Sequence, residues 1–405
     1  MKILQINSVV NTGSTGRIAE NIGLSVMEQS WESFIAFGRG QPESKSSLIN
    51  VGSKCDFYVH VLKTRLSDAH GLGSINASKD LVVKIKEIKP DIIHLHNIHG
   101  YYLNIEILFN FLSKANIPIV WTLHDCWSFT GHCAYFDFVN CNKWKTECFD
   151  CPNIQSYPES WFVDNSRKNF RIKKELFTSV DNITLVPVSK WLDNVLTNSF
   201  FKGYPSKVIH NGIDLSVFNI IDSKLSLCNK YKLNQDRPIL LGVAGVWDKR
   251  KGLADFIKIQ NKNLDYQIVL VGLNKTQIKS LPSSILGIER TESIEELAQL
   301  YNLADVFVNP TYEDNFPTTN LEALACGTPV ITYNTGGSPE AIDENTGYVV
   351  EKGDIGGLIE KIELISKQGK RFYQSKCRER AERLYNKDDR YNDYIELYKE
   401  ILNKR

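Results

Sequence analysis

The sequence lacks several features that would set it apart from ordinary globular proteins. Its longest apolar run, residues 239–247, falls well short of the roughly 18 residues that a membrane-spanning helix needs. Lysine and arginine total 48 against 47 aspartates and glutamates, so no net charge draws the chain to nucleic acid. The first ten residues, MKILQINSVV, contain one lysine and no small-residue cleavage site, unlike a signal peptide. We therefore expect a cytoplasmic protein with no nucleic-acid partner.

Length and composition leave room for two packed domains. The 405 residues are 42% hydrophobic and 23% charged, which is typical of globular chains. Short apolar runs alternate with longer helical patterns. The expected strands are residues 2–6, 34–37, 91–96, 118–124, 183–188 and 207–209, then 238–244, 266–271, 304–309 and 329–333. Continuously apolar strands are typical of a parallel sheet covered by helices on both faces, so this alternation predicts a doubly wound α/β fold.

The strands fall into two sets, which predicts two Rossmann-like domains whose parallel sheets face each other across a cleft. We expect the first domain at residues 1–210 and the second at 211–387, joined near Asn211 and Gly212. The polar stretch from about 213 to 237 contains no clear strand. Residues 388–405 have apolar side chains at helical spacing, and we expect this helix to pack back on the first domain. Ligands should bind beyond the carboxyl ends of the strands, in the cleft.

A glycine-containing segment follows the first strand. In NTGSTGR, residues 11–17, Gly13 and Gly16 permit a tight turn and a close approach of the backbone to a ligand, and the following helix start favours an anion. The third glycine of a dinucleotide fingerprint is missing, which argues against an NAD enzyme. A plain tight turn is the alternative.

A second segment, DNFPTTNLE at residues 314–322, separates two carboxylates by eight positions. Pro317 suits the first turn of a helix and Gly327 its end, so Asp314 precedes the helix and Glu322 lies inside it. A carboxylate so placed can accept hydrogen bonds from a ribose diol, while free N–H groups at the helix start receive phosphate. The alternative is one surface acid and one capping acid.

This segment resembles the acid-x7-acid motif of the retaining glycosyltransferases of family four, which have the GT-B fold. The similarity extends over NPTYEDNFPTTNLEALACGTPVITYNTGGSPEAI and includes VIHNGIDLSVF, PVSKW and VAGVWDKRKG. DIIHLHNIHGYYLN and WTLHDCWSFTGHCAYF look like the branch that builds bacterial surface polysaccharides, such as capsule and O-antigen. The resemblance covers nearly the entire chain.

The resemblance implies a donor site in the second domain. Glu322 would bind the ribose hydroxyls of a nucleoside diphosphate sugar. Asp314 stands where the family usually has glutamate and would contact the donor sugar with a shorter reach. The backbone of Asn315, Phe316, Pro317, Thr318 and Thr319 would line the sugar and diphosphate, and Gly13 and Gly16 would contribute from the first domain.

The resemblance also implies cations at the leaving diphosphate. Lys251 matches the family's lysine, but Val246 stands where its arginine is usual, and Arg250 is the nearest replacement. Without a cation the leaving-group charge would be poorly stabilised. Alternatively, residues 249–251 are a solvated basic run.

In the first domain, His124 of TLHD matches a histidine that approaches the donor sugar, with Asp125 able to orient its ring. A satisfied core or capping histidine is the alternative. His96 and Asn97, at the end of a strand, and Tyr101 are candidates for acceptor binding. For the histidines at 94, 96 and 99 we favour hydrogen bonding over metal binding.

The resemblance implies retention of anomeric configuration without a protein nucleophile and without a catalytic cofactor. The donor would be UDP- or GDP-linked, and the acceptor a glycan or lipid-linked oligosaccharide. Alternative functions are an inactive nucleotide-sugar-binding scaffold, motivated by Val246 and Asp314, and an epimerase or phosphorylase of the same fold.

Four cysteines gather in the loop 126–152: Cys133, Cys141, Cys148 and Cys151. Four sulfurs ending in a CxxC pair suit a tetrahedral structural zinc site, which we expect here, close to the acceptor side. Free or redox-active thiols and disulfides are the alternatives.

Residues 167–177 form a basic helical stretch. Arg167, Lys168, Arg171 and Lys174 share one helical face, with Phe170 and Phe177 alongside. Such a helix can lie on an anionic membrane, which would make the protein peripheral on the inner face of the plasma membrane. A solvated helix face is the alternative.

Overall fold

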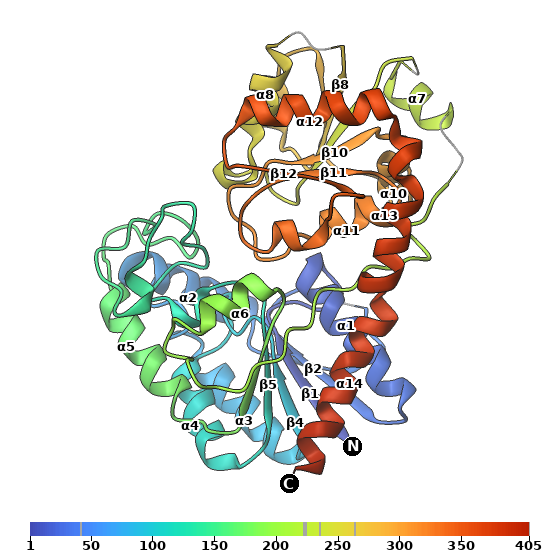
Figure 1. The fold of residues 1–405 in the computed structure, drawn as a ribbon. Coiled ribbons are helices and arrows are strands. Elements are labelled where there is room, and N and C mark those ends of the chain that lie inside the picture. Colours follow the sequence, from blue (N-terminus) through green and yellow to red (C-terminus); the bar gives the residue numbers. More distant parts are fainter. Residues whose placement is uncertain (41–42, 222–224, 235, 263–264, 405) are drawn as a thin grey trace. The chain divides into compact units, whose positions relative to one another are not determined.

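The structure is a computed structural model that describes residues 1–40, 43–221, 225–234, 236–262 and 265–404. The chain forms two compact units (Figure 1). The first comprises Met1–His210 and Tyr391–Arg405, and the second comprises Asn211–Arg390. Each unit has its own sheet with helices on both faces, so each is described by itself.

The first unit is built on a sheet of six parallel strands. In spatial order they are β3 (Ser47–Asn50), β2 (Glu32–Phe37), β1 (Lys2–Asn7), β4 (Ile92–Leu95), β5 (Ile119–Leu123) and β6 (Ile183–Pro187). All residues of β4 and β5 are buried, as expected of central strands covered on both faces. The strand order reverses between β1 and β4, and ligands of such sheets bind beyond the strand ends at that point.

The first unit also contains helices and short 3-10 turns. They are α1 (Gly13–Glu28), α2 (Lys54–Ser67), α3 (Ile75–Ile88), α4 (Ile105–Ala115), η1 (Trp127–Phe129), η2 (Lys143–Lys145), α5 (Ser166–Phe177), α6 (Lys190–Leu196) and α14 (Lys387–Asn403). Several begin at capping side chains: Ser53, Asn104 and Ser189 each accept a hydrogen bond from the N–H three residues on. Local sequence therefore fixes where these helices start.

The last helix, α14, contributes to the core of the first unit. Tyr391, Tyr394, Ile395, Leu397 and Tyr398 pack in one buried cluster with residues of β1, α1, β4, β5 and β6. Two of its phenols reach the central strands, because Tyr398 and Tyr394 hydrogen-bond His94 and Thr122. The end of the chain thus completes the first unit.

The second unit repeats the same sheet order. Its six parallel strands are β12 (Gly347–Val350), β11 (Val330–Tyr333), β10 (Val306–Asn309), β7 (Ile239–Val243), β8 (Gln267–Val271) and β9 (Ile285–Ile288). Its helices and 3-10 turns are α7 (Leu225–Tyr231), η3 (Lys249–Lys251), α8 (Leu253–Gln260), α9 (Lys275–Ser280), α10 (Ile294–Leu303), α11 (Thr318–Ala325), η4 (Ser338–Ala341), α12 (Ile355–Gln368) and α13 (Lys370–Tyr385). The strand order reverses between β7 and β10.

The expected strands form with one exception. Residues 207–209 are not a strand: Lys207 and Ile209 only donate backbone hydrogen bonds to Leu185 and Pro187 of β6. Three observed strands, β3, β9 and β12, were not expected. All three lie at sheet edges and are partly exposed, so they lack the continuous apolar run that marks a central strand.

The C-terminal helix begins one residue before its expected start and ends at Asn403, while Arg405 lies outside the described residues. Within the described ranges, no helix is both long enough and apolar enough to span a lipid bilayer.

Candidate active site

The second unit places its acidic segment at the start of α11. Pro317 is the N-cap of the helix, and Gly327, with φ of +69°, follows its end. The turn before α11 lies against the segment after β11: Gly337 N–H donates to the Asp314 carbonyl at 3.2 Å. A Cβ on Gly336 would lie 1.8 Å from that carbonyl oxygen, so this approach requires glycine.

Glu322 lies in α11 and is 9% exposed. Its Oε2 accepts a hydrogen bond from the Tyr301 hydroxyl of α10 at 2.8 Å. Burial, followed by the Glu322 charge, raises the pKa of Tyr301 well above its usual value, so the phenol stays a donor. Tyr301 thus orients the carboxylate, and no motif in the sequence marks it for that role.

Lys251 and Asp314 form a hydrogen-bonded ion pair. Lys251 ends η3, which follows β7, and Gly252 after it has φ of +74°. A Cβ there would lie 2.2 Å from the Pro310 carbonyl oxygen, so glycine lets η3 lie against the segment after β10. The side chains of both charged residues are about one-fifth exposed.

Arg250 contacts the same acidic segment. Its Nη1 donates to the Glu313 carbonyl at 3.3 Å, and its Nη2 pairs with Asp248 at 2.8 Å. Val246 is 71% exposed and supplies no charge. The structure therefore brings Arg250, Lys251 and Asp314 together at the carboxyl ends of β7 and β10.

The residues between Asp314 and Glu322 differ in exposure. Asn315 and Phe316 are buried, and the Phe316 ring packs 5.8 Å from that of Tyr385. Thr318 and Thr319, in the first turn of α11, are half-buried. Thr318 and Thr319 can therefore contact a ligand through their side chains, whereas Asn315 and Phe316 can do so mainly through their backbone.

In the first unit, a buried histidine, His96, follows β4 and a partly buried one, His124, follows β5. His96 Nε2 hydrogen-bonds Gln5 at 3.0 Å, and its Nδ1 lies 3.1 Å from His124 Nε2. Burial lowers the pKa of His124 to about 4 and that of His96 well below its usual value, so both rings are neutral near pH 7. His94 is held inside the sheet by Thr122 and Tyr398 and serves the core.

Asp125 does not orient His124 as expected. Its Oδ2 lies 2.8 Å from His99 Nε2, and His99 Nδ1 lies 3.0 Å from the Tyr157 hydroxyl. That hydroxyl lies 3.4 Å from His70. The neighbouring residues 124 and 125 direct their side chains to different partners, and the chain Asp125–His99–Tyr157–His70 combines segments that no sequence spacing connects.

The glycine turn lines a pocket of about 360 Å³ in the first unit. Its lining residues are Ser8, Val9, Thr12, Gly13, Ser14, Thr15, Arg39, Asn97, His99 and Tyr157. The turn closes through a 2.9 Å hydrogen bond from Asn11 N–H to the Gly16 carbonyl. Gly16 is not among the lining residues, and neither is Tyr101, which is 6% exposed.

Family models match two parts of the chain. The model described as "Glycosyltransferase Family 4" matches residues 33–217, and "Glycosyl transferases group 1" matches residues 237–368. The chain belongs to glycosyltransferase family 4. Each match falls largely within one of the two units.

Among relatives of this family 4 member, WcaC of Escherichia coli K12, named for colanic acid biosynthesis, is 23% identical over 89% of this chain and 90% of its own length. CapM of Staphylococcus aureus, a capsular polysaccharide biosynthesis glycosyltransferase, is 30% identical over 38% of this chain and 43% of its own length.

Solved structures share the fold of this family 4 chain. Sucrose-phosphate synthase from Thermosynechococcus elongatus has a TM-score of 0.75 and 19% identity over the full length of both chains. Anabaena Alr3699/HepE in complex with UDP-glucose has a TM-score of 0.69 and 16% identity over 99% of this chain and 100% of that one. The two units are thus those of a GT-B fold.

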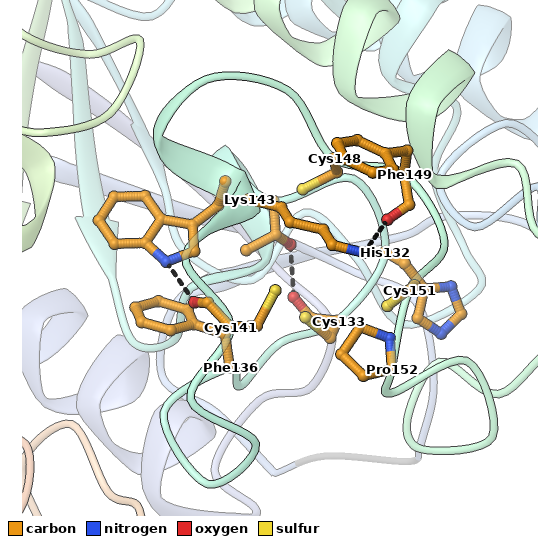
Figure 2. Close-up of a pocket in the computed structure, with 11 residues that line it drawn as sticks. His132, Cys133, Phe136, Cys141, Lys143, Cys148, Phe149, Cys151 and Pro152 are labelled. Carbon is orange, nitrogen blue, oxygen red and sulfur yellow. Dashed lines mark hydrogen bonds between the residues drawn. The ribbon is translucent and has the colours of Figure 1, made fainter.

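The expected zinc site is not supported. Cys133, Cys141, Cys148 and Cys151 line one pocket of about 10 Å³ in the first unit (Figure 2). Over the described part of the chain, no three His, Cys, Asp or Glu side chains are arranged to hold a metal ion. The Cys133 thiol hydrogen-bonds the Cys151 sulfur, and the Gly131 N–H donates to Cys148 Sγ at 3.2 Å.

Other contacts hold the cysteine-rich loop. The Phe136 ring, labelled in Figure 2, packs 4.8 Å from that of Trp144, and both residues line the pocket. His132 hydrogen-bonds the fully buried Asp68 at 2.6 Å. Lys173 of α5, 2% exposed, donates to the carbonyls of Trp127 and Thr130 at 2.7 and 3.0 Å. Aromatic packing and buried hydrogen bonds thus hold this loop.

The two phenylalanines of α5, Phe170 and Phe177, do not anchor its basic face. Phe170 and Phe177 are 3% and 0% exposed, so they face the interior of the unit and not the surface with the basic residues. Arg167 and Arg171 both pair with Glu147. Two of the four basic residues on this face are therefore held in surface ion pairs.

Proposed function

We propose that this family 4 member is a retaining glycosyltransferase. It transfers a sugar from a UDP- or GDP-linked donor to a hydroxyl of a growing, lipid-linked bacterial surface glycan. The relatives named for colanic acid and capsular polysaccharide support the product class, and the UDP-glucose complex of Alr3699/HepE supports a nucleoside diphosphate sugar as donor.

The observation that carries the proposal is the cluster at the carboxyl ends of β7 and β10. Lys251 and Arg250 supply positive charge beside Asp314, and the start of α11 adds free N–H groups. Glu322, oriented by Tyr301, is a buried acceptor for a diol. One nucleoside diphosphate needs both features: cations for its phosphates and a carboxylate for its ribose.

In this proposal, donor binding displaces Asp314 from Lys251. The ammonium then faces the diphosphate, whose negative charge grows as the bond to the sugar breaks, while Asp314 accepts a hydrogen bond from a sugar hydroxyl. Placing fixed charge where charge develops is the largest catalytic term in many enzymes. Neutral His124 exchanges hydrogen bonds with the sugar. We assign no protein nucleophile: the leaving diphosphate takes the proton of the acceptor hydroxyl as the new bond forms.

The donor site is tested by ligand-induced stabilisation. We expect UDP or GDP, but not ADP or CMP, to raise the melting temperature of the full-length protein, because a ligand that binds only the folded state stabilises it. Glu322→Ala should abolish this rise. The exposed Glu344 of the same unit provides the matched control, since Glu344→Ala should preserve it.

Nucleotide binding without transfer to any acceptor would point to the inactive scaffold and refute the proposed activity. With an active preparation, the anomeric configuration of the product, read by NMR, tests retention. Full activity in excess EDTA would support chemistry that relies on Lys251 and Arg250; loss of activity that is restored by a divalent cation would contradict it.

A further inference from the structure

Apart from a histidine, the 360 Å³ pocket that the glycine turn lines has a single charged side chain among its lining residues. That residue is Arg39; the others are hydroxyl, amide, imidazole and phenol groups, together with Gly13 and Val9. No aspartate or glutamate lines it. The pocket therefore combines positive charge with many neutral hydrogen-bonding groups, which suits a polyhydroxylated ligand that bears an acid.

Arg39 is available for such a ligand. It is exposed, and it forms no ion pair or hydrogen bond with any residue that the structure describes. Its charge acts on the phenols beside the pocket: burial raises the pKa of Tyr101 and Tyr157, and the Arg39 charge opposes that rise. The guanidinium field thus reaches the pocket.

The fold fixes the position of Arg39 at the end of β2. The preceding Gly38 donates its N–H to the Ser8 carbonyl at 3.2 Å. A Cβ at Gly38 would lie 2.2 Å from the Tyr102 side chain, which in turn donates to the Asn97 carbonyl at 3.0 Å. Glycine at position 38 therefore lets β2 deliver Arg39 to the same edge as Ser8 and Asn97.

Two further features of the pocket offer hydrogen-bond donors to a ligand: the Ser8 hydroxyl and the start of α1. Ser8 is 5% exposed, and its hydroxyl forms no hydrogen bond within the described residues. The N-cap of α1, Thr12, makes no side-chain capping bond, and the first turn of that helix has no acidic residue. A buried hydroxyl and an uncapped helix start both favour an anion or a hydroxyl-rich ligand.

We infer that this pocket binds an acidic sugar of the acceptor, with its carboxylate or phosphate on Arg39 and its hydroxyls on Ser8, Asn97 and Tyr157. The inference rests on the proposed function, in which the first unit holds the acceptor. It assigns the donor diphosphate elsewhere, to Lys251 and Arg250 of the second unit, which leaves Arg39 for an anion on the acceptor.

Three sugars that differ at carbon 6 test the inference on the full-length protein: glucose, glucuronate and glucose 6-phosphate. Their dissociation constants are measured by ligand-observed NMR titration. We expect at least one acidic sugar to bind roughly tenfold more tightly than glucose, as a charge-assisted hydrogen bond provides. The acid whose affinity exceeds that of glucose by the larger factor identifies the acidic group of the acceptor sugar as carboxylate or phosphate.

The preference for the acid should fall to about twofold or less in Arg39→Gln and persist in Arg39→Lys. It should also persist in Arg290→Gln, which removes an exposed arginine of the second unit. Equal or undetectable binding of all three sugars would overturn the inference, as would an acid preference that survives in Arg39→Gln.

Competition separates acceptor from donor. Saturating UDP should leave the binding of the acidic sugar unchanged, and its displacement by UDP would assign the anion site to the donor diphosphate instead. The Glu322→Ala variant should still prefer the acidic sugar although it no longer binds UDP. If Glu322→Ala binds UDP normally, the proposed donor site fails, while the sugar titrations still decide the present inference.

Discussion

Removing one hydroxyl group, that of Tyr301, tests the logic of the donor site most directly. Tyr301 is fully buried, and its ring packs between Phe218 and Phe307, so Tyr301→Phe keeps the packing. What is lost is the 2.8 Å hydrogen bond to Glu322. Hydrogen bonds to charged groups contribute about 1.5–3 kcal/mol, so we expect the free energy of unfolding to fall by about 2 kcal/mol.

Nucleotide affinity should fall as well. Without the phenol, the Glu322 carboxylate can rotate away from the position in which it receives two ribose hydroxyls. We expect UDP, or GDP if that is the preferred nucleotide, to bind about fivefold to tenfold more weakly, which corresponds to roughly 1 kcal/mol. Urea denaturation measures the first effect and isothermal titration calorimetry the second.

Tyr333→Phe is the matched control. Tyr333 is also fully buried in the second unit and donates to a buried carboxylate, Asp255, at 2.9 Å. Asp255 also accepts hydrogen bonds from Tyr312 and Lys258. The loss of stability in Tyr333→Phe should therefore be smaller, about 1 kcal/mol, and nucleotide affinity should not change. Equal nucleotide affinity in Tyr301→Phe and the wild type would refute the orienting role of Tyr301, whatever the change in stability.

Three further predictions concern the rest of the fold. Iodoacetamide should alkylate Cys151 with a midpoint near pH 7, because a hydrogen bond from Cys133 lowers the pKa of Cys151 to about 7. Burial raises the pKa of Cys148 to about 12, so Cys148 should react more slowly. Mass spectrometry that finds Cys148 modified first would contradict this prediction. Burial lowers the pKa of Lys173 from 10.5 to about 7, so the unfolded chain binds more protons between these values and stability should rise with pH by up to about 1.4 kcal/mol per unit. Urea titrations from pH 7 to 8.5 should show that Lys173→Met lacks this rise. Gly242→Ala should destabilise the second unit by about 1–3 kcal/mol in the same assay, since its Cβ would lie 2.5 Å from the Phe256 ring; an unchanged midpoint would contradict the overpacking.

The central strands could be predicted from sequence because burial on both faces leaves a mainly apolar run, as in residues 119–123, where only Thr122 is polar. Three edge strands, β3, β9 and β12, could not, because they are partly exposed and contain polar residues or glycine. Helix starts at Ser53, Asn104 and Ser189 are local, since each capping side chain bonds a backbone group three residues away.

The cysteine-rich loop shows where spacing misleads. Four cysteines that include a CxxC pair form a metal site only if their sulfurs are arranged as ligands around one point, and over the described residues no such arrangement is found. Here Lys173, forty or more residues from the carbonyls it holds, and the pair of Asp68 with His132 fix the loop instead. Such contacts depend on the packing of α5 and α2 against the loop, which no local pattern encodes.

By itself, the sequence determined the α/β class, the central strands and the segment from Asp314 to Glu322, because these depend on neighbours along the chain. Only the tertiary structure decided which groups meet. Tyr301 reaches Glu322 from another helix, Asp125 bonds His99 and not the adjacent His124, and Arg39 enters a pocket formed by the ends of other strands. The physical reason is that parallel strands distant in sequence end at one edge of the sheet, where their following residues become neighbours in space.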